Sequence, residues 1–218
     1  MPIGIYKEKL MTKNNQSIKP AVVELERLFK AINKKKFNGS LPWCAIIVQS
    51  TSNKNAHGWF FANSWVRKGD RKPVHELSMC AESLNRPIED ILNTLIHEMV
   101  HLYCHVNDIG DCKNNYHNVK FKVQCNLVDL ECTQIPRYGW ASTKLTPKLK
   151  KELMALRPKK TAFTVFRKSE MGRQKRGSKL KKWQCPQCKT NIRVGYLPEN
   201  FPGVDCRECG REYQCLEH

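Results

Sequence analysis

The sequence predicts an α+β fold: one domain of ordinary size, followed by a small C-terminal cysteine module. Its length of 218 residues is sufficient for such a domain and an accessory module. Helical periodicity and short apolar runs follow one another in the first part of the chain, and two Cys-x-x-Cys pairs lie near its end. The hydrophobic fraction of 40% and the charged fraction of 27% are typical of a globular protein.

The first elements are predicted from apolar spacing. Residues 1–18 are expected to be loosely ordered. A helix is then predicted from about Lys19 to Lys35, where apolar residues recur at spacings of three and four. Short strands are predicted over residues 44–48, 57–61 and 76–80, and the last of these is interpreted as a sheet edge.

Two further helices are predicted downstream. The first runs from about Pro87 to His105, and Pro87 suits its first turn because a proline lacks the N–H that is unused there. The second is expected to begin near His117 and to continue to about Val128. A last strand is predicted over residues 162–166.

Positive charge is concentrated in one segment. The net charge is +18, and residues 137–182 hold 16 Lys or Arg against the two acids Glu152 and Glu170, which gives +14. Such a block indicates a polyanionic partner, most often nucleic acid. A solvated linker that only maintains solubility is the alternative, and residues 167–182 are interpreted as a basic linker.

The composition also bears on location and redox state. No stretch approaches the ~20 consecutive apolar residues of a membrane span, and the first residues lack the apolar core of a signal peptide. We expect a cytoplasmic monomer without a membrane partner, associated with the nucleoid if the host is a bacterium or a phage. The 11 cysteines are expected to be reduced, with the seven outside the Cys-x-x-Cys pairs mainly filling the core.

A metal-binding pattern lies within the long predicted helix. His97-Glu98-Met99-Val100-His101 has the form H-E-x-x-H. Residues four apart on a helix share a face, so the two imidazoles can bind one zinc ion. Glu98 is placed to act as the general base toward the attacking water. The alternative interpretation is that these are ordinary polar residues of an exposed helix.

A catalytic zinc ion requires a third protein ligand. His105 lies eight residues after His97, about 12 Å along a helix axis, and is therefore interpreted as a surface or supporting residue. His117 follows a loop long enough to turn the chain back and is the expected third ligand. Asp108, Asp111 and Glu131 remain as alternatives.

The C-terminal module has the spacing of a structural zinc site. Cys185 and Cys188 are separated by 17 residues from Cys206 and Cys209. Four thiolates at this spacing predict a closed tetrahedral site that supplies the folding energy of a short segment. A dithiol redox pair is the alternative.

The module and the linker before it also offer basic and aromatic side chains. The nucleic-acid contacts predicted here are Lys175, Arg176, Lys179, Lys181, Lys182, Trp183, Arg193, Arg207 and Arg211. Tyr196 and Tyr213 are further candidates for stacking on bases. A module that instead packs against its own catalytic domain would have the same composition.

These residues resemble a known family. The run Leu95–Leu102, then a polar loop, then His117-Asn118-Val119-Lys120-Phe121, is similar to the SprT-like (Spartan-type) metallopeptidase domain. The similarity covers about residues 21–130, and bacterial members often end in a zinc ribbon. The glycines that usually surround the third histidine of the family, as in Gly-x-x-His-Gly, are absent here.

The resemblance implies a zincin-like metallopeptidase domain over residues 19–166 and a zinc ribbon over residues 183–218. It implies His97, His101 and His117 as ligands of a catalytic zinc ion, with Glu98 as the base. Eukaryotic members are DNA-dependent proteases that degrade proteins crosslinked to DNA.

The combined expectation is a zinc-dependent endopeptidase with one catalytic and one structural zinc ion. Its substrates would be DNA-associated or DNA-crosslinked proteins, and its nucleic-acid partner single-stranded or junction-containing DNA. The substrate is expected to add itself to the strand over residues 76–80. Two alternatives remain: a non-proteolytic, nucleic-acid-binding regulatory protein, and a peptidase whose basic stretch binds an acidic protein. Glu98 favours catalysis, because a structural zinc site needs no carboxylate there.

Overall fold

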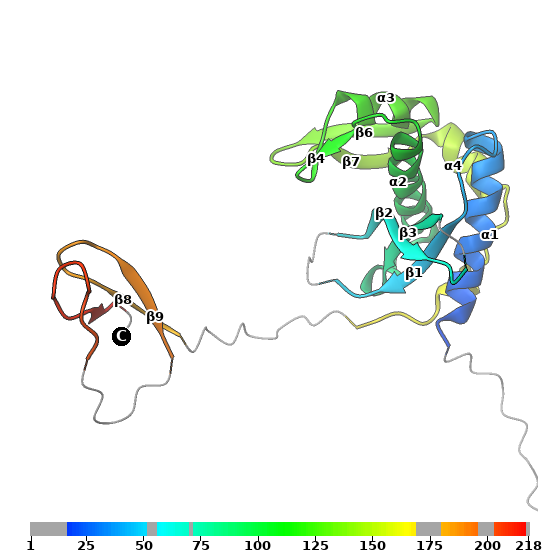
Figure 1. Cartoon of the computed structure of the whole chain (residues 1–218). Coiled ribbons are helices and arrows are strands. Elements are labelled where there is room, and N and C mark those ends of the chain that lie inside the picture. Colours follow the sequence, from blue (N-terminus) through cyan, green and yellow to red (C-terminus); the bar gives the residue numbers. More distant parts are fainter. Residues whose placement is uncertain (1–16, 52–55, 70–71, 169–179, 196–202, 217–218) are drawn as a thin grey trace, which may run out of the picture. The chain divides into compact units, whose positions relative to one another are not determined.

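The computed structural model describes residues 17–51, 56–69, 72–168, 180–195 and 203–216 (Figure 1). The chain divides into two compact units, residues 1–169 and 170–218. Residues 1–16 of the segment expected to be loosely ordered lie outside the described residues. No helix in the described ranges is both long enough and apolar enough to cross a membrane.

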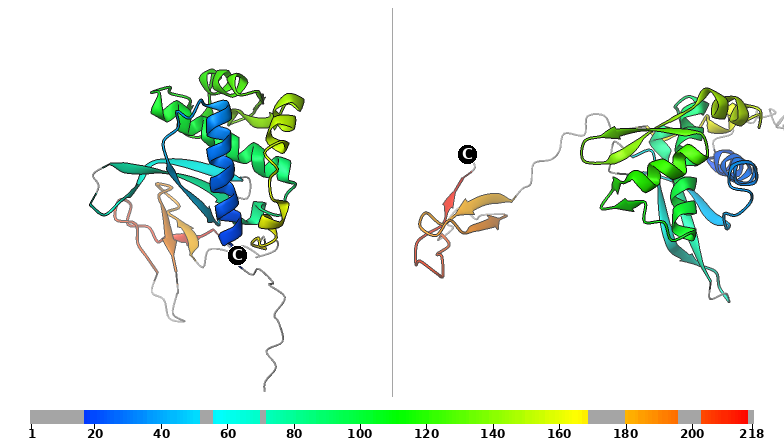
Figure 2. Two further views of the ribbon diagram at one scale, coloured as in Figure 1. Left: turned by 90° about the vertical axis from the view of Figure 1, so that its right-hand side faces the viewer. Right: turned by 90° about the horizontal axis from the view of Figure 1, so that it is seen from above.

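The first unit is a mixed α+β structure in which helices pack against two small sheets (Figure 2). Its helices are α1 (Lys19–Lys36), α2 (Ile88–Val106), α3 (Val119–Leu127) and α4 (Pro147–Met154), with short 3-10 helices η1 (Ala81–Ser83) and η2 (Lys160–Phe163). One sheet has the order β1-β3-β2, with β1 (Cys44–Gln49), β2 (Gly58–Val66) and β3 (Pro73–Cys80). The other has the order β4-β5-β7-β6, with β4 (Cys112–Lys113), β5 (Tyr116–His117), β6 (Leu130–Ile135) and β7 (Gly139–Leu145).

The core of this unit lies between α1, α2 and the first sheet. Leu25 and Ile32 of α1 and Leu95 of α2 are all fully buried. Parallel pairing of β1 with β3 places Ile46 beside Leu77, and both side chains belong to the same core. The apolar periodicity seen in the sequence therefore marks the faces that meet, and α2 is held firmly along its length.

The buried carboxylate of Glu24 fixes α1 to the chain that follows α4. The Glu24 carboxylate accepts hydrogen bonds from the Arg27 guanidinium at 2.6 and 2.9 Å and from the backbone N–H of Lys159 at 2.8 Å. Glu24 is only 3% exposed, so these donors replace the water that it loses on folding.

Two strand predictions are wrong. β3 is not a sheet edge, because β1 and β2 flank it on either side. Residues 160–163 form η2 instead of a strand that begins at Ala162, and Phe163 is buried against the main core. The β-branched and aromatic residues of that segment indicate burial, but no neighbouring strand is present to pair with it among the described residues.

The region after α2 differs most from the expectation. His117 lies in β5, and α3 begins only at Val119, where the Asn118 side chain accepts hydrogen bonds from the backbone N–H groups of Lys120 and Phe121. The hairpin of β6 and β7 and the helix α4 were not predicted. Thr146 caps α4 by accepting from the N–H of Leu149, and Pro147 begins it.

The second unit is a small sheet around the cysteines. Its strands are β8 (Lys181–Gln184), β9 (Asn191–Val194) and β10 (Gln214–Cys215), in the order β10-β8-β9. Among the described residues of this unit, the buried core consists of Cys185, Cys206 and Tyr213, with Trp183, Ile192, Val204 and Cys209 packed against it. A four-cysteine group in such a small unit is typical of a domain organised by metal.

Candidate metal centre and active site

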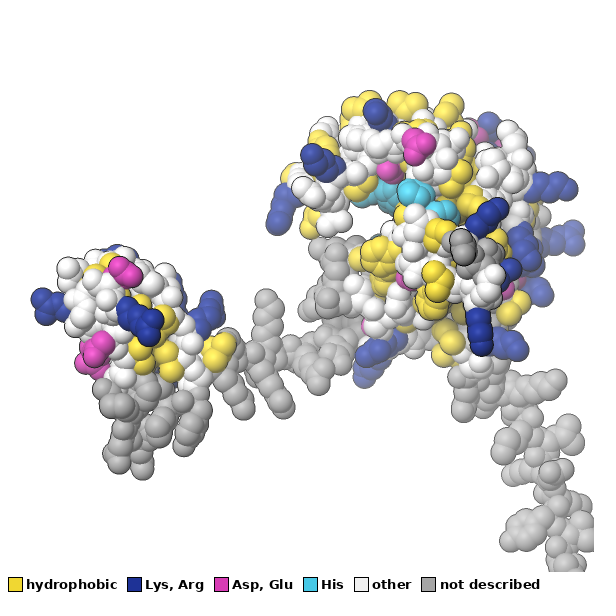
Figure 3. Space-filling view, in the orientation of Figure 1, with side chains coloured by type: hydrophobic (Ala, Val, Ile, Leu, Met, Phe, Trp, Pro, Cys, Tyr) yellow, Lys and Arg dark blue, Asp and Glu magenta, His cyan; other side chains and the backbone are white. Residues whose placement is uncertain are grey.

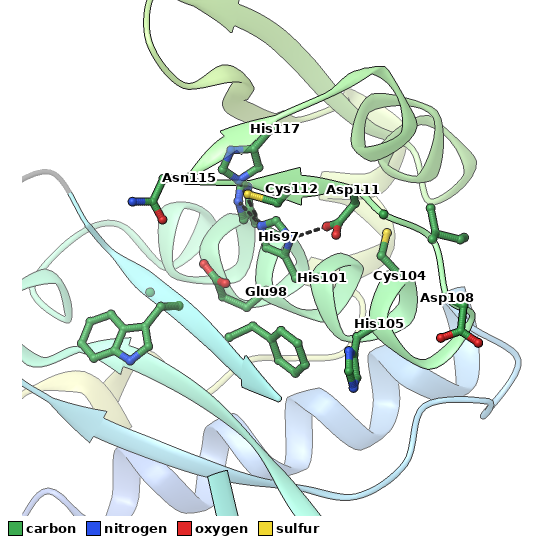
Figure 4. Close-up of a pocket in the computed structure, with 15 residues that line it drawn as sticks. His97, Glu98, His101, Cys104, His105, Asp108, Asp111, Cys112, Asn115 and His117 are labelled. Atoms are coloured by element: carbon green, nitrogen blue, oxygen red, sulfur yellow. Dashed lines mark hydrogen bonds and ion pairs between the residues drawn. The ribbon is translucent and has the colours of Figure 1, made fainter. Parts of the chain in front are cut away.

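Three histidines meet at the bottom of a hollow in the first unit (Figure 3). His97 and His101 lie one turn apart on α2, and His117 reaches them from β5 (Figure 4). The Nε2 atom of His101 is 3.3 Å from that of His97 and 3.0 Å from that of His117. Tetrahedral zinc with Zn–N bonds of ~2.0–2.1 Å separates its ligand atoms by about 3.3 Å, so this set of three nitrogens fits one zinc ion.

The other ring nitrogen of each histidine is held by a different group. Nδ1 of His101 lies 2.5 Å from the carboxylate of Asp111, Nδ1 of His97 lies 3.1 Å from the hydroxyl of Thr143, and Nδ1 of His117 lies 3.2 Å from the carbonyl oxygen of Tyr138. An Nδ1–H that donates to each of these oxygens leaves Nε2 with its lone pair directed at the metal position.

Burial adjusts the charge states of this centre. It lowers the pKa of His97 well below the usual value, with His101 and His117 as further causes, and lowers the pKa of His117 to about 4. Both rings are therefore neutral near pH 7, which is the form that binds metal. Burial also raises the pKa of the Glu98 carboxyl to about 7, near the range in which a carboxylate can exchange a proton efficiently.

Two asparagines account for the missing glycines before His117. Asn114 and Asn115 have φ angles of 51° and 63° and form the two-residue turn between β4 and β5. Asparagine tolerates this left-handed conformation better than most residues, and the turn of a tight hairpin requires it. After the turn, His117 pairs with Gly139 of β7, which has a φ of 66° and whose missing side chain leaves room for the His117 carbonyl.

Glu98 lies where β2 approaches α2. Its side chain is 5% exposed and lines the same cleft as the histidines. A Cβ atom on Gly58 would lie 2.8 Å from Cγ2 of Thr94, 2.9 Å from the carbonyl oxygen of Ser78 and 3.2 Å from Cγ of Glu98. Only glycine therefore lets β2 pass this close to the helix. Gly58, Trp59 and Phe60 bring the free edge of β2 to the cleft.

The remaining candidates for the third ligand lie elsewhere. Asp111 contacts the Nδ1 side of His101, Asp108 is exposed on the rim of the cleft, and Glu131 is exposed on β6. His105 packs its ring against Phe60 and His75. Among the described residues of this unit, only His97, His101 and His117 form a group that could hold a metal ion.

Thr143 and Tyr138 were not predicted as site residues. Both come from the chain of the β6–β7 hairpin and its turn, which was itself not predicted. Asp111 was considered only as a ligand, whereas the structure places it beside a ligand. A polar residue near a histidine motif gives no indication in the sequence of which ring nitrogen it will face.

The four ribbon cysteines form a second group that could hold a metal ion. The Sγ atoms of Cys185, Cys188, Cys206 and Cys209 all lie within 4.8 Å of one another, and those of Cys188 and Cys206 are 3.5 Å apart. Tetrahedral zinc with Zn–S bonds of ~2.3 Å separates its sulfur ligands by about 3.8 Å, which fits. A hydrogen bond from the Thr190 hydroxyl lowers the pKa of Cys188 to about 6, which favours the thiolate that binds metal.

The two cysteine knuckles share one backbone design. The N–H of Lys189 donates to the carbonyl of Cys185 at 3.1 Å, and the N–H of Gly210 donates to that of Cys206 at 2.7 Å. Lys189 and Gly210 have φ angles of 60° and 61°. Each knuckle therefore turns back sharply just after its second cysteine.

The predicted nucleic-acid contacts are placed unequally. The exposed ones among the described residues are Lys181, Arg193, Arg207 and Arg211, while Lys182 and Trp183 are half-buried. Tyr213 is 7% exposed in the core of the ribbon, so the prediction that it stacks on bases is wrong. Lys175, Arg176, Lys179 and Tyr196 lie outside the described residues.

Comparison with known proteins gives one result for the first unit. The sequence model of the SprT-like family matches residues 25–138, which includes the three histidines, Glu98 and β1 to β3. The match ends before the ribbon. No curated protein matches the chain.

Proposed function

The chain belongs to the SprT-like family, and from this premise we propose that it is a zinc-dependent endopeptidase acting on proteins associated with or crosslinked to DNA. The family is linked to metallopeptidase-like function. The observation that carries the proposal is the convergence of three Nε2 atoms beside Glu98 in one cleft.

His97, His101 and His117 would hold the catalytic zinc through Nε2. Zinc at this position supplies a Lewis acid that polarises the peptide carbonyl and makes hydroxide available near pH 7. Glu98 takes a proton from the attacking water and then donates it to the nitrogen of the leaving amine. Asp111, Thr143 and the Tyr138 carbonyl keep the three rings in the orientation that this chemistry needs.

The substrate is proposed to bind as an extended chain along the free edge of β2. Gly58, Trp59 and Phe60 line the cleft beside Glu98, and β2 pairs only with β3 within its sheet. Main-chain hydrogen bonds to a strand edge depend little on the side chains of the substrate, which suits a protease of broad specificity. β2 thus takes the role that was expected of the strand over residues 76–80.

We propose that DNA determines which proteins are cleaved, because it brings the protease close to the proteins that are bound to it. The segment 137–182 carries 16 basic residues against two acids, and the ribbon adds the exposed Arg193, Arg207 and Arg211. Phosphate contacts of this kind give affinity without sequence preference. A protease of broad specificity would then cleave only proteins that are bound to the same DNA molecule.

Metal content and cleavage, measured together, test this function. We expect two zinc ions per chain and cleavage of casein or histone that single-stranded DNA stimulates. Glu98→Gln should keep both zinc ions and lose cleavage by several orders of magnitude, because no other carboxylate replaces the proton acceptor. Cleavage that persists in this variant would refute the mechanism. Zinc in the ribbon alone, without cleavage, would instead support a non-proteolytic, DNA-binding protein.

A further inference from the structure

The sheet of β1, β3 and β2 has two unequal faces. Side chains alternate along strands, and Ile46, Leu77 and Phe60 face the helices and the core. The opposite face, called here the aromatic face, is defined by Trp59, Phe61 and Trp65 of β2 and by Trp43, which directly precedes β1. Trp43 is 54% exposed, Phe61 53% and Trp65 46%, so large rings at both outer strands of this sheet are open to solvent.

A buried polar network fixes part of this face. Glu76 of β3 lies beneath it and is 7% exposed. Its carboxylate accepts hydrogen bonds from the Trp65 indole N–H at 2.8 Å, the Ser78 hydroxyl at 2.6 Å and the Gln49 amide at 3.0 Å. The edge of the Trp65 ring is therefore held while its surface stays exposed, which lowers the entropic cost of binding a flat ligand.

The charge around the aromatic face is positive. The Arg67 guanidinium carbon lies 5.8 Å from the centre of the Trp43 ring, and Lys68 and Lys72 are exposed near the same end of the sheet. β1, β2 and β3 contain one acid, Glu76, and it is buried. Exposed rings bordered by cations are complementary to unpaired bases joined by phosphates.

We propose that the aromatic face binds single-stranded nucleic acid by stacking unpaired bases on Trp43, Phe61 and Trp65. Stacking on rings of an exposed sheet is a general way of holding single strands. Trp59 and Phe61 also line the cleft that contains Glu98. A strand on this face would thus lead directly to the site of cleavage. The proposal rests on the nucleic-acid partner of the proposed function, but not on peptidase activity.

The test measures binding by the full chain in a Glu98→Gln background. The ligands are fluorescent oligothymidylate, oligouridylate and a hairpin duplex, and the readouts are anisotropy and tryptophan quenching. Trp43→Ala and Phe61→Ala should each weaken binding of single strands on the order of tenfold, with little change for the duplex, because only unpaired bases can stack. Trp43→Phe, which keeps a ring, should bind nearly as wild type. The two oligonucleotides separate a preference for DNA from one for RNA.

Two controls isolate the aromatic face. Leu127→Ala removes a side chain that is 71% exposed on α3 and should leave binding unchanged. Arg193→Glu on the ribbon should weaken single strands and duplex alike. Thermal unfolding and zinc content verify that each variant is folded.

Wild-type affinity for single strands in both alanine variants would overturn the proposal. If only Arg193→Glu weakens binding, base stacking on the aromatic face is refuted, whereas nucleic-acid binding by the chain is supported. A wild-type chain that binds none of the three ligands would refute that partner as well, and casein cleavage would still test the peptidase separately.

Discussion

Each of the three proposed ligand histidines has a distinct partner for its second ring nitrogen, and these partners differ in hydrogen-bond strength. His97 has a hydroxyl, His117 a backbone carbonyl and His101 the carboxylate of Asp111. A charged acceptor makes the stronger hydrogen bond and increases the electron density of the ring. The Nε2 atom of His101 also lies within 3.3 Å of the Nε2 atoms of both other histidines. Asp111 is therefore the residue outside the ligand set on which the centre depends most.

Asp111→Asn should lower the affinity of the catalytic site for zinc by about 10–100-fold, because the neutral amide cannot stabilise the Nδ1–H of His101 to the same degree. Competition with a chelator measures this loss, and the zinc of the ribbon serves as an internal reference in the same chain. Asp108→Asn is the matched control, since Asp108 lines the same cleft but is exposed. Equal retention of zinc by the two variants would contradict this role of Asp111.

Local sequence pattern predicted α1 and α2 well, but it missed α4 and predicted strand pairing poorly. The predicted bounds of α1 and α2 differ from the observed bounds by about one residue, because apolar periodicity and caps are local. The position of β3 in the middle of its sheet depends on contacts between distant segments, which spacing alone does not encode. The β6–β7 hairpin was missed for the same reason, and with it the partners of His97 and His117.

The turn before His117 can be predicted from its own two residues. The family glycines are absent, but Asn114-Asn115 is itself a turn signal, because asparagine adopts positive φ at modest cost. A two-residue hairpin at this point would have placed His117 in a strand.

β2 carries both proposed binding functions, and Gly58 sets its distance from Glu98. In Gly58→Ala the added methyl group would lie 2.8 Å from Thr94 Cγ2 and 2.9 Å from the Ser78 carbonyl oxygen, so the strand must shift. Misplacement on this scale can lower kcat/KM by about 10²-fold. Casein cleavage measures the loss, and zinc content should stay at the wild-type level because no ligand moves.

The control for Gly58→Ala is Gly110→Ala in the same cleft, where a Cβ atom meets no atom within 4 Å. This variant should cleave casein at close to the wild-type rate. If both variants cleave equally well, the close approach of β2 to α2 is not what positions Glu98.

The two units differ in the interactions that stabilise their folds. The first has an extensive apolar core around α1, α2 and β3, whereas the buried core of the second, among its described residues, is Cys185, Cys206 and Tyr213. Burial of these side chains contributes little free energy, so we expect metal binding to supply most of the stability of the ribbon. The first unit should therefore tolerate loss of the ribbon metal.

Cys206→Ser tests this independence. Removing a thiolate that is 2% exposed should reduce zinc from two ions to one per chain and abolish protection of residues 180–195 and 203–216 from hydrogen exchange. The first unit should unfold at an unchanged temperature and cleave casein at an unchanged rate without DNA. Stimulation by DNA should fall, because the ribbon arginines lose their fixed positions. Cys215→Ser makes the same chemical change outside the four-cysteine group and should keep both zinc ions. If Cys206→Ser also loses cleavage without DNA, the catalytic unit depends on the folded ribbon, and the separation of roles between the two units is wrong.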